Sequence, residues 1–378
     1  MLSPDYLLHI TEGAEEIASQ LHTNMLKQVI RRILAREKKG YDYILTAADK
    51  WRIESVIETG ILRDDLIKEI TKYTKYEEKE IREAFEEAGI KALDYDDKIY
   101  QRAGLSPVPL QQSPYMIRLM QRDYEATMAE WSNFTRTTAD ATEIAFIDTM
   151  DQIYSRVMSG STGYIEAFTD GIDSLAKTGL FVSYPTGHKD TIETATLRCV
   201  RTGVSQASAE IQIARMDEMD VDLVLVSSHM GARPSHQVWQ GKIYSRSGKS
   251  DKYPDFVSST GYGTGEGLCG WNCRHNFSPY FEGMGNPFER YDDKENKELY
   301  ERTQDQRAME RGIRKSKREK EALEDAVNHA PDDGTKESLN SKLTEAKDRL
   351  RKQNKAYREF CEENNLKPLP ERLRIAKR

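Results

Sequence analysis

A heptad repeat near the C-terminus is the strongest restriction on how this chain folds. Its apolar stripe runs through Leu339, Leu343, Leu350, Tyr357 and Phe360, with Ala346 on the same face and Gln353 as its one polar member. A thinner apolar stripe precedes it over 299–327, and the turn sequence Pro331-Asp332-Asp333-Gly334 separates the two. The pattern predicts a charged helical hairpin over 291–364, followed by a tail at 365–378.

The first half of the chain also has helical periodicity. Ser3-Pro4-Asp5 is typical of a helix start, and apolar residues then recur every three or four positions: Leu7, Ile10, Ala14, Ile17 and Leu21. We expect a helical region over 1–105, with helix ends at Gly40, Gly60 and Gly89. A proline-rich linker at 103–115 leads to a second helical region over 113–220.

The pattern changes at residue 221. The segment VDLVLVSS (221–228) is rich in β-formers and predicts a strand. Glycines, aromatic residues, cysteines and histidines dominate the residues that follow, with little helical periodicity. We therefore predict a compact α+β module at 221–287 within a mainly α-helical protein.

Charge and cysteine content narrow the functional classes. The 378 residues have a formal net charge of -7, which argues against a broadly basic protein that coats nucleic acid. Within the charged hairpin, the run IRKSKREK (313–320) is the one segment suited to phosphate contact. The four cysteines do not form a disulfide framework, and we find neither a signal peptide nor an apolar segment long enough to span a bilayer. These features indicate a reducing, cytoplasmic setting.

The module contains a candidate zinc site. Three residues separate Cys269 from Cys273 in the chain, and His275 follows two positions later, a spacing that suits a zinc loop. His229 or His236 would complete a tetrahedral set, and we select His236 for the candidate set. The alternative interpretation is that both thiols are small buried apolar groups and that the histidines are hydrogen-bonded packing residues.

Other chemistry has weaker support. The glycine-rich TGYGTGEG (260–267) suits either a phosphate-binding nest or simple tight turns, and SGKS (247–250) lacks the upstream glycine of a P-loop. The deaminase, HExxH and GxSxG patterns do not occur in this module. A nucleophilic pair of Cys273 or Cys269 with His236 stays open as an enzymatic alternative.

Two long motifs carry a family resemblance. HMGARPSHQVWQGKIYS (229–245) and STGYGTGEGLCGWNCRHNFSPYFEG (259–283) resemble the phage minor capsid protein 2 family of tailed bacteriophages, and more distantly the Mu-type head morphogenesis proteins. The family signature falls on His229, Gly231, Arg233, His236, Trp239, Gly241, Cys269, Asn272, Cys273, Arg274 and His275.

The resemblance implies a structural protein of the virion, not an enzyme. It implies association with the portal and capsid proteins during head assembly, at the portal vertex or capsid interior, and in the host cytoplasm before that. No membrane and no small-molecule substrate are expected. Two alternatives remain: a portal-associated enzyme that uses the Cys/His cluster on DNA or protein, and an accessory protein that contacts DNA through 313–320.

Overall fold

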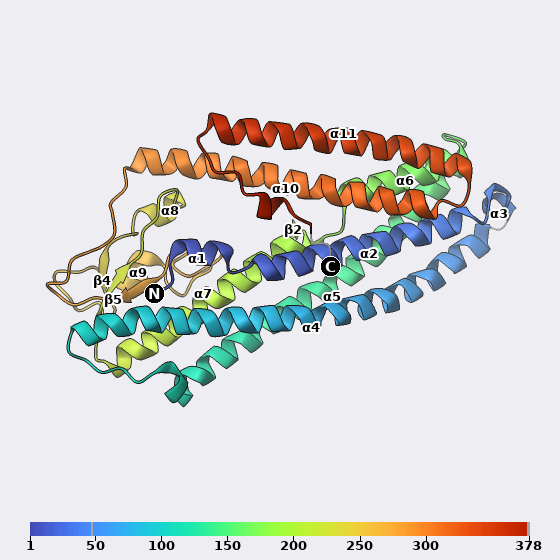
Figure 1. Cartoon of the computed structure of the whole chain (residues 1–378). Helices are drawn as coiled ribbons and strands as arrows, with labels where there is room; N and C mark the ends of the chain where they lie inside the picture. The colour runs from blue at the N-terminus through green and yellow to red at the C-terminus, as the bar shows by residue number, and fades with distance from the viewer. Residues whose placement is uncertain (47, 376–378) are drawn as a thin grey trace. The chain divides into compact units, whose positions relative to one another are not determined.

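The computed structural model describes residues 1–46 and 48–375 (Figure 1). The chain is mainly α-helical with small β-sheets, which confirms the predicted fold class. The long helices are α2 (Glu12–Glu37), α4 (Ala48–Arg102), α5 (Pro114–Met158), α7 (Ile192–Glu218), α10 (Asp293–His329) and α11 (Asp333–Glu363). The shorter elements are α1 (Pro4–His9), α3 (Tyr41–Thr46), α6 (Tyr164–Thr178) and 3-10 turns at Leu110–Gln112 and Pro370–Leu373. Among the described helices, none is long and apolar enough for a membrane crossing.

The chain divides into two compact units, each assembled from three stretches of sequence. Unit 1 contains Met1–Glu15, Glu77–Trp131 and Thr196–Gln304; unit 2 contains Glu16–Tyr76, Ser132–Ala195 and Asp305–Arg378. The last three residues of the predicted tail, 376–378, lie outside the described residues. The segment boundaries predicted from the sequence stay predictions.

Unit 1 holds the sheet of the α+β module. β3 (Leu223–Val226) is its central strand and pairs antiparallel with β4 (Ile243–Ser245) and β5 (Phe277–Pro279). Val224 lies opposite Tyr244 on one side and Pro279 on the other. Apolar side chains of this sheet share a buried core with residues of α4, α7 and the short helix α9 (Phe256–Thr260): Tyr100, Ala209, Met216, Val224, Val226, Tyr244, Phe256 and Phe277. The predicted strand is therefore correct.

Unit 2 contains α11 and the part of α10 from Asp305 onward, and these two helices of the predicted hairpin run side by side (Figure 1). The Asp332 carboxylate caps α11 by accepting a 2.8 Å hydrogen bond from the Thr335 N–H. Ile313 packs with Tyr357 and Cys361 in a buried cluster between the two helices. A short antiparallel ladder of β1 (Val182–Ser183) and β2 (Lys189–Asp190) lies in the predicted second helical region.

Three predicted features of the first helical region are wrong. Gly60 and Gly89 lie inside α4 and do not end helices. A glycine inside a helix costs only about 1 kcal/mol relative to alanine, which packing can offset. A Cβ at Gly89 would meet the Met120 side chain, so glycine there permits close approach of α4 and α5 within unit 1. The early apolar stripe is also interrupted, because Ile10 and Thr11 form a turn between α1 and α2.

Candidate functional site

His236 is presented by a short helix that directly follows the central strand. After β3 the chain loops to α8 (Pro234–Gln237), whose first residue is proline and whose N-cap is Arg233. Proline suits the first helical position because its fixed φ is already helical. The His236 N–H then donates to the Arg233 carbonyl at 2.8 Å, and the imidazole is only 3% exposed. The turn therefore directs this histidine into the module.

Cys273 and His275 are presented by the glycine-rich segment between α9 (Phe256–Thr260) and β5. Its turns fold tightly on themselves, because a Cβ at Gly267 or Gly270 would clash with loop carbonyl groups. Backbone N–H groups of the loop donate to acceptors in the same loop, as in Leu268 to the Thr260 carbonyl at 3.0 Å. These bonds support the tight-turn interpretation over a phosphate nest.

The structure brings His236, Cys273 and His275 together. Their ligand atoms all lie within 4.8 Å of one another, and all three residues are buried. The Cys273 Sγ is 3.7 Å from Nδ1 of His236 and 3.7 Å from Nδ1 of His275. The predicted set of metal-ligating residues is thus assembled in three of its four members.

The partners of the other ring nitrogens define the tautomers. His236 Nε2 lies 2.9 Å from the Glu266 carbonyl, which only accepts, so Nε2 carries the hydrogen. His275 Nε2 lies 3.0 Å from Oε1 of Gln240, and the same Oε1 accepts from the His229 backbone N–H at 3.0 Å. Because a backbone N–H can only donate, that amide oxygen is fixed in place. Both Nδ1 atoms therefore direct a bare lone pair at the sulfur.

Burial sets the charge state of the group. It lowers the pKa of His236 to about 4 and the pKa of His275 well below its ordinary value. It also raises the pKa of the Cys273 thiol to about 11, so the thiol of the metal-free protein is protonated near neutral pH. A cysteine nucleophile works as a thiolate in an electropositive, accessible setting. The geometry favours ligation over the nucleophilic alternative.

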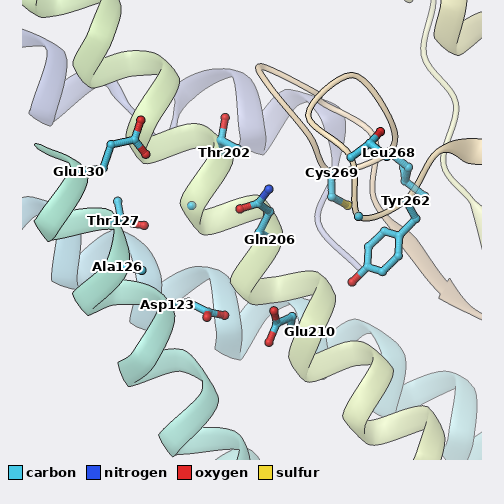
Figure 2. A pocket seen from close by; sticks show the side chains of 13 residues that line it. Asp123, Ala126, Thr127, Glu130, Thr202, Gln206, Glu210, Tyr262, Leu268 and Cys269 are labelled. Atoms are coloured by element: carbon cyan, nitrogen blue, oxygen red, sulfur yellow. The ribbon is translucent and has the colours of Figure 1, made fainter. Parts of the chain in front are cut away.

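Cys269 is separate from this group. Its thiol is buried and donates at 3.7 Å to the His275 carbonyl. Cys269 also lines a cavity of about 390 Å³ formed with α5 and α7, whose wall includes Gln206 and Glu210 (Figure 2). The fourth predicted ligand therefore lies beside the trio but outside it.

The remaining signature residues shape the module around the cluster. The His229 ring stacks on His275 with centroids 4.4 Å apart, and Trp239 packs edge-on against His275 at 4.8 Å. Gly231, Gly241 and Asn272 all have left-handed φ angles, at 74°, 67° and 55°.

The signature arginines bond to the module's loops. The Arg233 guanidinium donates to the Trp271 carbonyl at 3.3 Å, and Arg274 reaches His229 Nδ1 at 3.3 Å. These contacts indicate a structural role for most of the signature.

Sequence reasoning missed the residues that orient the cluster. Gln240 and the Glu266 carbonyl hold the two imidazoles, as described above. Asn296, from the first turn of α10, bonds both the N–H and the carbonyl of Ala232 at 2.9 and 3.0 Å. No sequence motif identifies an amide side chain that orients a histidine ring. The one available signal was that Gln240 lies inside the first long motif.

The basic run at 313–320 is largely used within unit 2. Arg314 donates to the Arg372 carbonyl and Lys317 to the Leu373 carbonyl, both at 2.6 Å. Arg318 is buried in an ion pair with Glu193. These three basic side chains therefore bond within the protein, whereas the DNA-contact hypothesis requires them to be available at the surface.

Comparisons with known proteins agree with the motifs. Residues 2–362 match the model of the family described as phage minor capsid protein 2. A relative described as "Structural protein", from Lactococcus phage LL-H, is 26% identical over 295 residues, which covers 73% of this chain and 78% of the relative. No solved structure matches the chain significantly.

Proposed function

The chain belongs to the phage minor capsid protein 2 family, and we propose that, within this class of virion structural proteins, it acts in head assembly. In this proposal it binds the portal protein or the inner face of the capsid. The relative from Lactococcus phage LL-H is also described as structural, which agrees with a place in the virion. The match over 2–362 includes the helical regions as well as the Cys/His module, so the proposal concerns both.

The observation that carries the proposal is an exposed apolar stripe on the part of α4 that belongs to unit 2. Ile53, Ile57 and Ile61 follow one another at four-residue spacing and are 60%, 58% and 48% exposed. Ile67, six residues after Ile61 and so outside this series, is 46% exposed. Residues four apart lie on one helix face, so Ile53, Ile57 and Ile61 form a continuous stripe. Exposed apolar patches of this kind mark protein–protein contact sites.

Partner binding also explains the chemistry of the Cys/His module better than catalysis does. The Cys273 thiol is only 2% exposed, so a substrate has no access to it. The module instead packs as a core around β3. A scaffold that presents helical surfaces to partner subunits is consistent with both features.

The test is co-expression of the chain with the portal and major capsid proteins of its phage. We expect the wild type to co-purify with the portal or to enter assembled heads. The double variant Ile57→Glu, Ile61→Glu should lose this association by at least tenfold, because two charges replace the buried apolar contact.

The matched control is Val257→Glu, which places a charge at another exposed apolar position, 50% accessible, in unit 1. It should associate like the wild type. If the double variant and the wild type associate equally well, the apolar stripe is not the partner-binding surface. Clean separation of the wild-type chain from both partners on gel filtration would remove the proposal itself.

A further inference from the structure

We propose that His236, Cys273 and His275 bind one Zn²⁺ ion through Nδ1, Sγ and Nδ1. The inference is independent of the assembly role, because it concerns how the module itself is held together. It also differs from the four-residue set suggested by the sequence, since Cys269 is not a ligand.

The distances suit a tetrahedral ion. Zn–S bonds of about 2.3 Å and Zn–N bonds of about 2.0–2.1 Å, at a tetrahedral angle, separate sulfur from nitrogen by about 3.5 Å. Both Sγ···Nδ1 distances in this structure are 3.7 Å. Both sulfur–nitrogen distances are thus close to those of a tetrahedral zinc site, and the three ligand atoms all lie within 4.8 Å of one another.

The number of hydrogen-bond donors among the three side chains also favours a bound cation. The Cys273 thiol has one hydrogen, yet two bare Nδ1 lone pairs face its sulfur. That hydrogen satisfies one of them and leaves the other without a hydrogen-bond donor among the described residues, which is costly in a buried site. A backbone N–H, that of His275, donates to the same sulfur at 3.3 Å and would stabilise it as a thiolate. On binding, the ion would replace the thiol proton, which leaves to solvent.

The outer partners match those of metal-bound histidines. Such histidines donate their second N–H to a carbonyl or carboxylate oxygen, which fixes the ring. Here His236 donates to the Glu266 carbonyl at 2.9 Å and His275 to Gln240 Oε1 at 3.0 Å.

The donor atoms select the metal. Imidazole nitrogen and thiolate sulfur suit zinc and are unsuited to Mg²⁺ or Ca²⁺, which require oxygen ligands. The three residues supply three positions of the tetrahedron, and a water would supply the fourth. Cys269 Sγ is instead placed against the His275 carbonyl and beside the cavity of Figure 2.

The full-length chain, expressed in zinc-supplemented medium, tests the proposal by elemental analysis. We expect one zinc per wild-type chain, fewer than 0.1 per chain for Cys273→Ser, a loss of about tenfold or more, and undiminished zinc for the matched control Cys269→Ser. Cobalt substitution should give a tetrahedral visible spectrum with a thiolate charge-transfer band, absent from Cys273→Ser.

A second measurement keeps the test valid if Cys273→Ser does not fold. Wild-type protein prepared without metal should melt at a lower temperature than the zinc-loaded protein, and one equivalent of zinc should restore the midpoint. The proposal is wrong if the wild type takes up no stoichiometric zinc. It is equally wrong if Cys269→Ser loses zinc as completely as Cys273→Ser does.

Discussion

Both units bury histidines, but they satisfy the two ring nitrogens in opposite ways. In unit 2, His22 Nε2 accepts from the Leu180 N–H at 2.9 Å, so its hydrogen is on Nδ1 and is donated to Glu193 at 3.2 Å. In unit 1, His236 and His275 carry the hydrogen on Nε2 and turn bare Nδ1 atoms to a sulfur. Both ring nitrogens of His22 have hydrogen-bond partners within the protein, whereas His236 and His275 each have a bare Nδ1 lone pair that a metal ion could accept.

The charges around the rings differ as well. Glu193 is fully buried, yet Arg318 pairs with it and His22 donates to it. Burial alone would raise the pKa of Glu193, but these two partners, Arg318 first, hold it below its usual range. His22, which contacts an acid that pairs with an arginine, is thus part of a charged network. His236 and His275, whose Nδ1 atoms face a thiol, are candidate metal ligands.

The largest effect should come from breaking the charged network of unit 2. Arg318→Met removes the cation and leaves the buried, charged Glu193 with only the His22 hydrogen bond. Loss of one partner of a buried pair costs about 3–5 kcal/mol. We expect a fall of this size in the free energy of unfolding, measured by urea denaturation.

The control for that variant is Arg31→Met. Arg31 makes the same type of pair with Asp325, at 2.8 Å, but its side chain is 48% exposed. Exposed pairs contribute about 0–1 kcal/mol. Equal losses for the two variants would contradict the view that burial makes the network of unit 2 critical.

An acid without a cation sharpens the contrast with Glu193. Glu37 is buried, its Oε1 accepts from the Thr335 hydroxyl, and its Oε2 has no hydrogen-bond partner in the described part of the chain. Burial raises its pKa from 4.5 to about 7. The folded state therefore holds the proton more tightly than the unfolded state, and stability falls as pH rises from about 4.5 to 7.

Glu37→Gln keeps an oxygen acceptor for Thr335 and stays neutral at every pH. We expect no gain near pH 4.5 and a gain in unfolding free energy of up to about 3 kcal/mol above pH 7. Glu345→Gln, on the exposed surface of α11, is the control. Unfolding curves at a series of pH values give the measurement, and a pH-independent difference would show that Glu37 is charged in the folded protein.

Local patterns predicted the helices and strand, but not how distant segments meet. The heptad stripe is a local property, so the α10–α11 hairpin follows from sequence, as does β3 from its β-formers. Gly89 was wrongly predicted to end a helix, because the need for glycine at this position comes from a contact with Met120, which lies on another helix. Tertiary packing overrides local preference at such positions.

The candidate site divides in the same way. Cys273 and His275 are neighbours in the chain, so their association was predictable. Spacing could not choose between His229 and His236, nor show that Cys269 faces away; the turn at α8 and the folded glycine loop decide both. No sequence signal marked Gln240, because its role depends on a fold that places its amide oxygen next to two donors, the backbone N–H of His229 and the ring Nε2–H of His275.

A smaller effect should follow from removing the amide that orients His275. Gln240→Ala deletes the acceptor for His275 Nε2, and loss of such an outer partner typically lowers metal affinity about 10–100-fold. Competition with a chromophoric chelator measures the zinc Kd. Gln206→Ala is the control, because Gln206 lies on α7 in the wall of the cavity of Figure 2. Similar Kd values for both variants would show that the outer bond does not tune the site.

The smallest expected response is at His22, and it tests the comparison most directly. With 15N-histidine labelling, the seven histidines are few enough to assign by substitution. Without metal, His22 should show the Nδ1–H tautomer, and His236 and His275 the Nε2–H tautomer. One equivalent of zinc should shift the Nδ1 resonances of His236 and His275 strongly and leave His22 unchanged, because its only bare nitrogen already accepts from Leu180. A zinc-dependent change of tautomer at His22 would mean that the two buried environments are not chemically distinct.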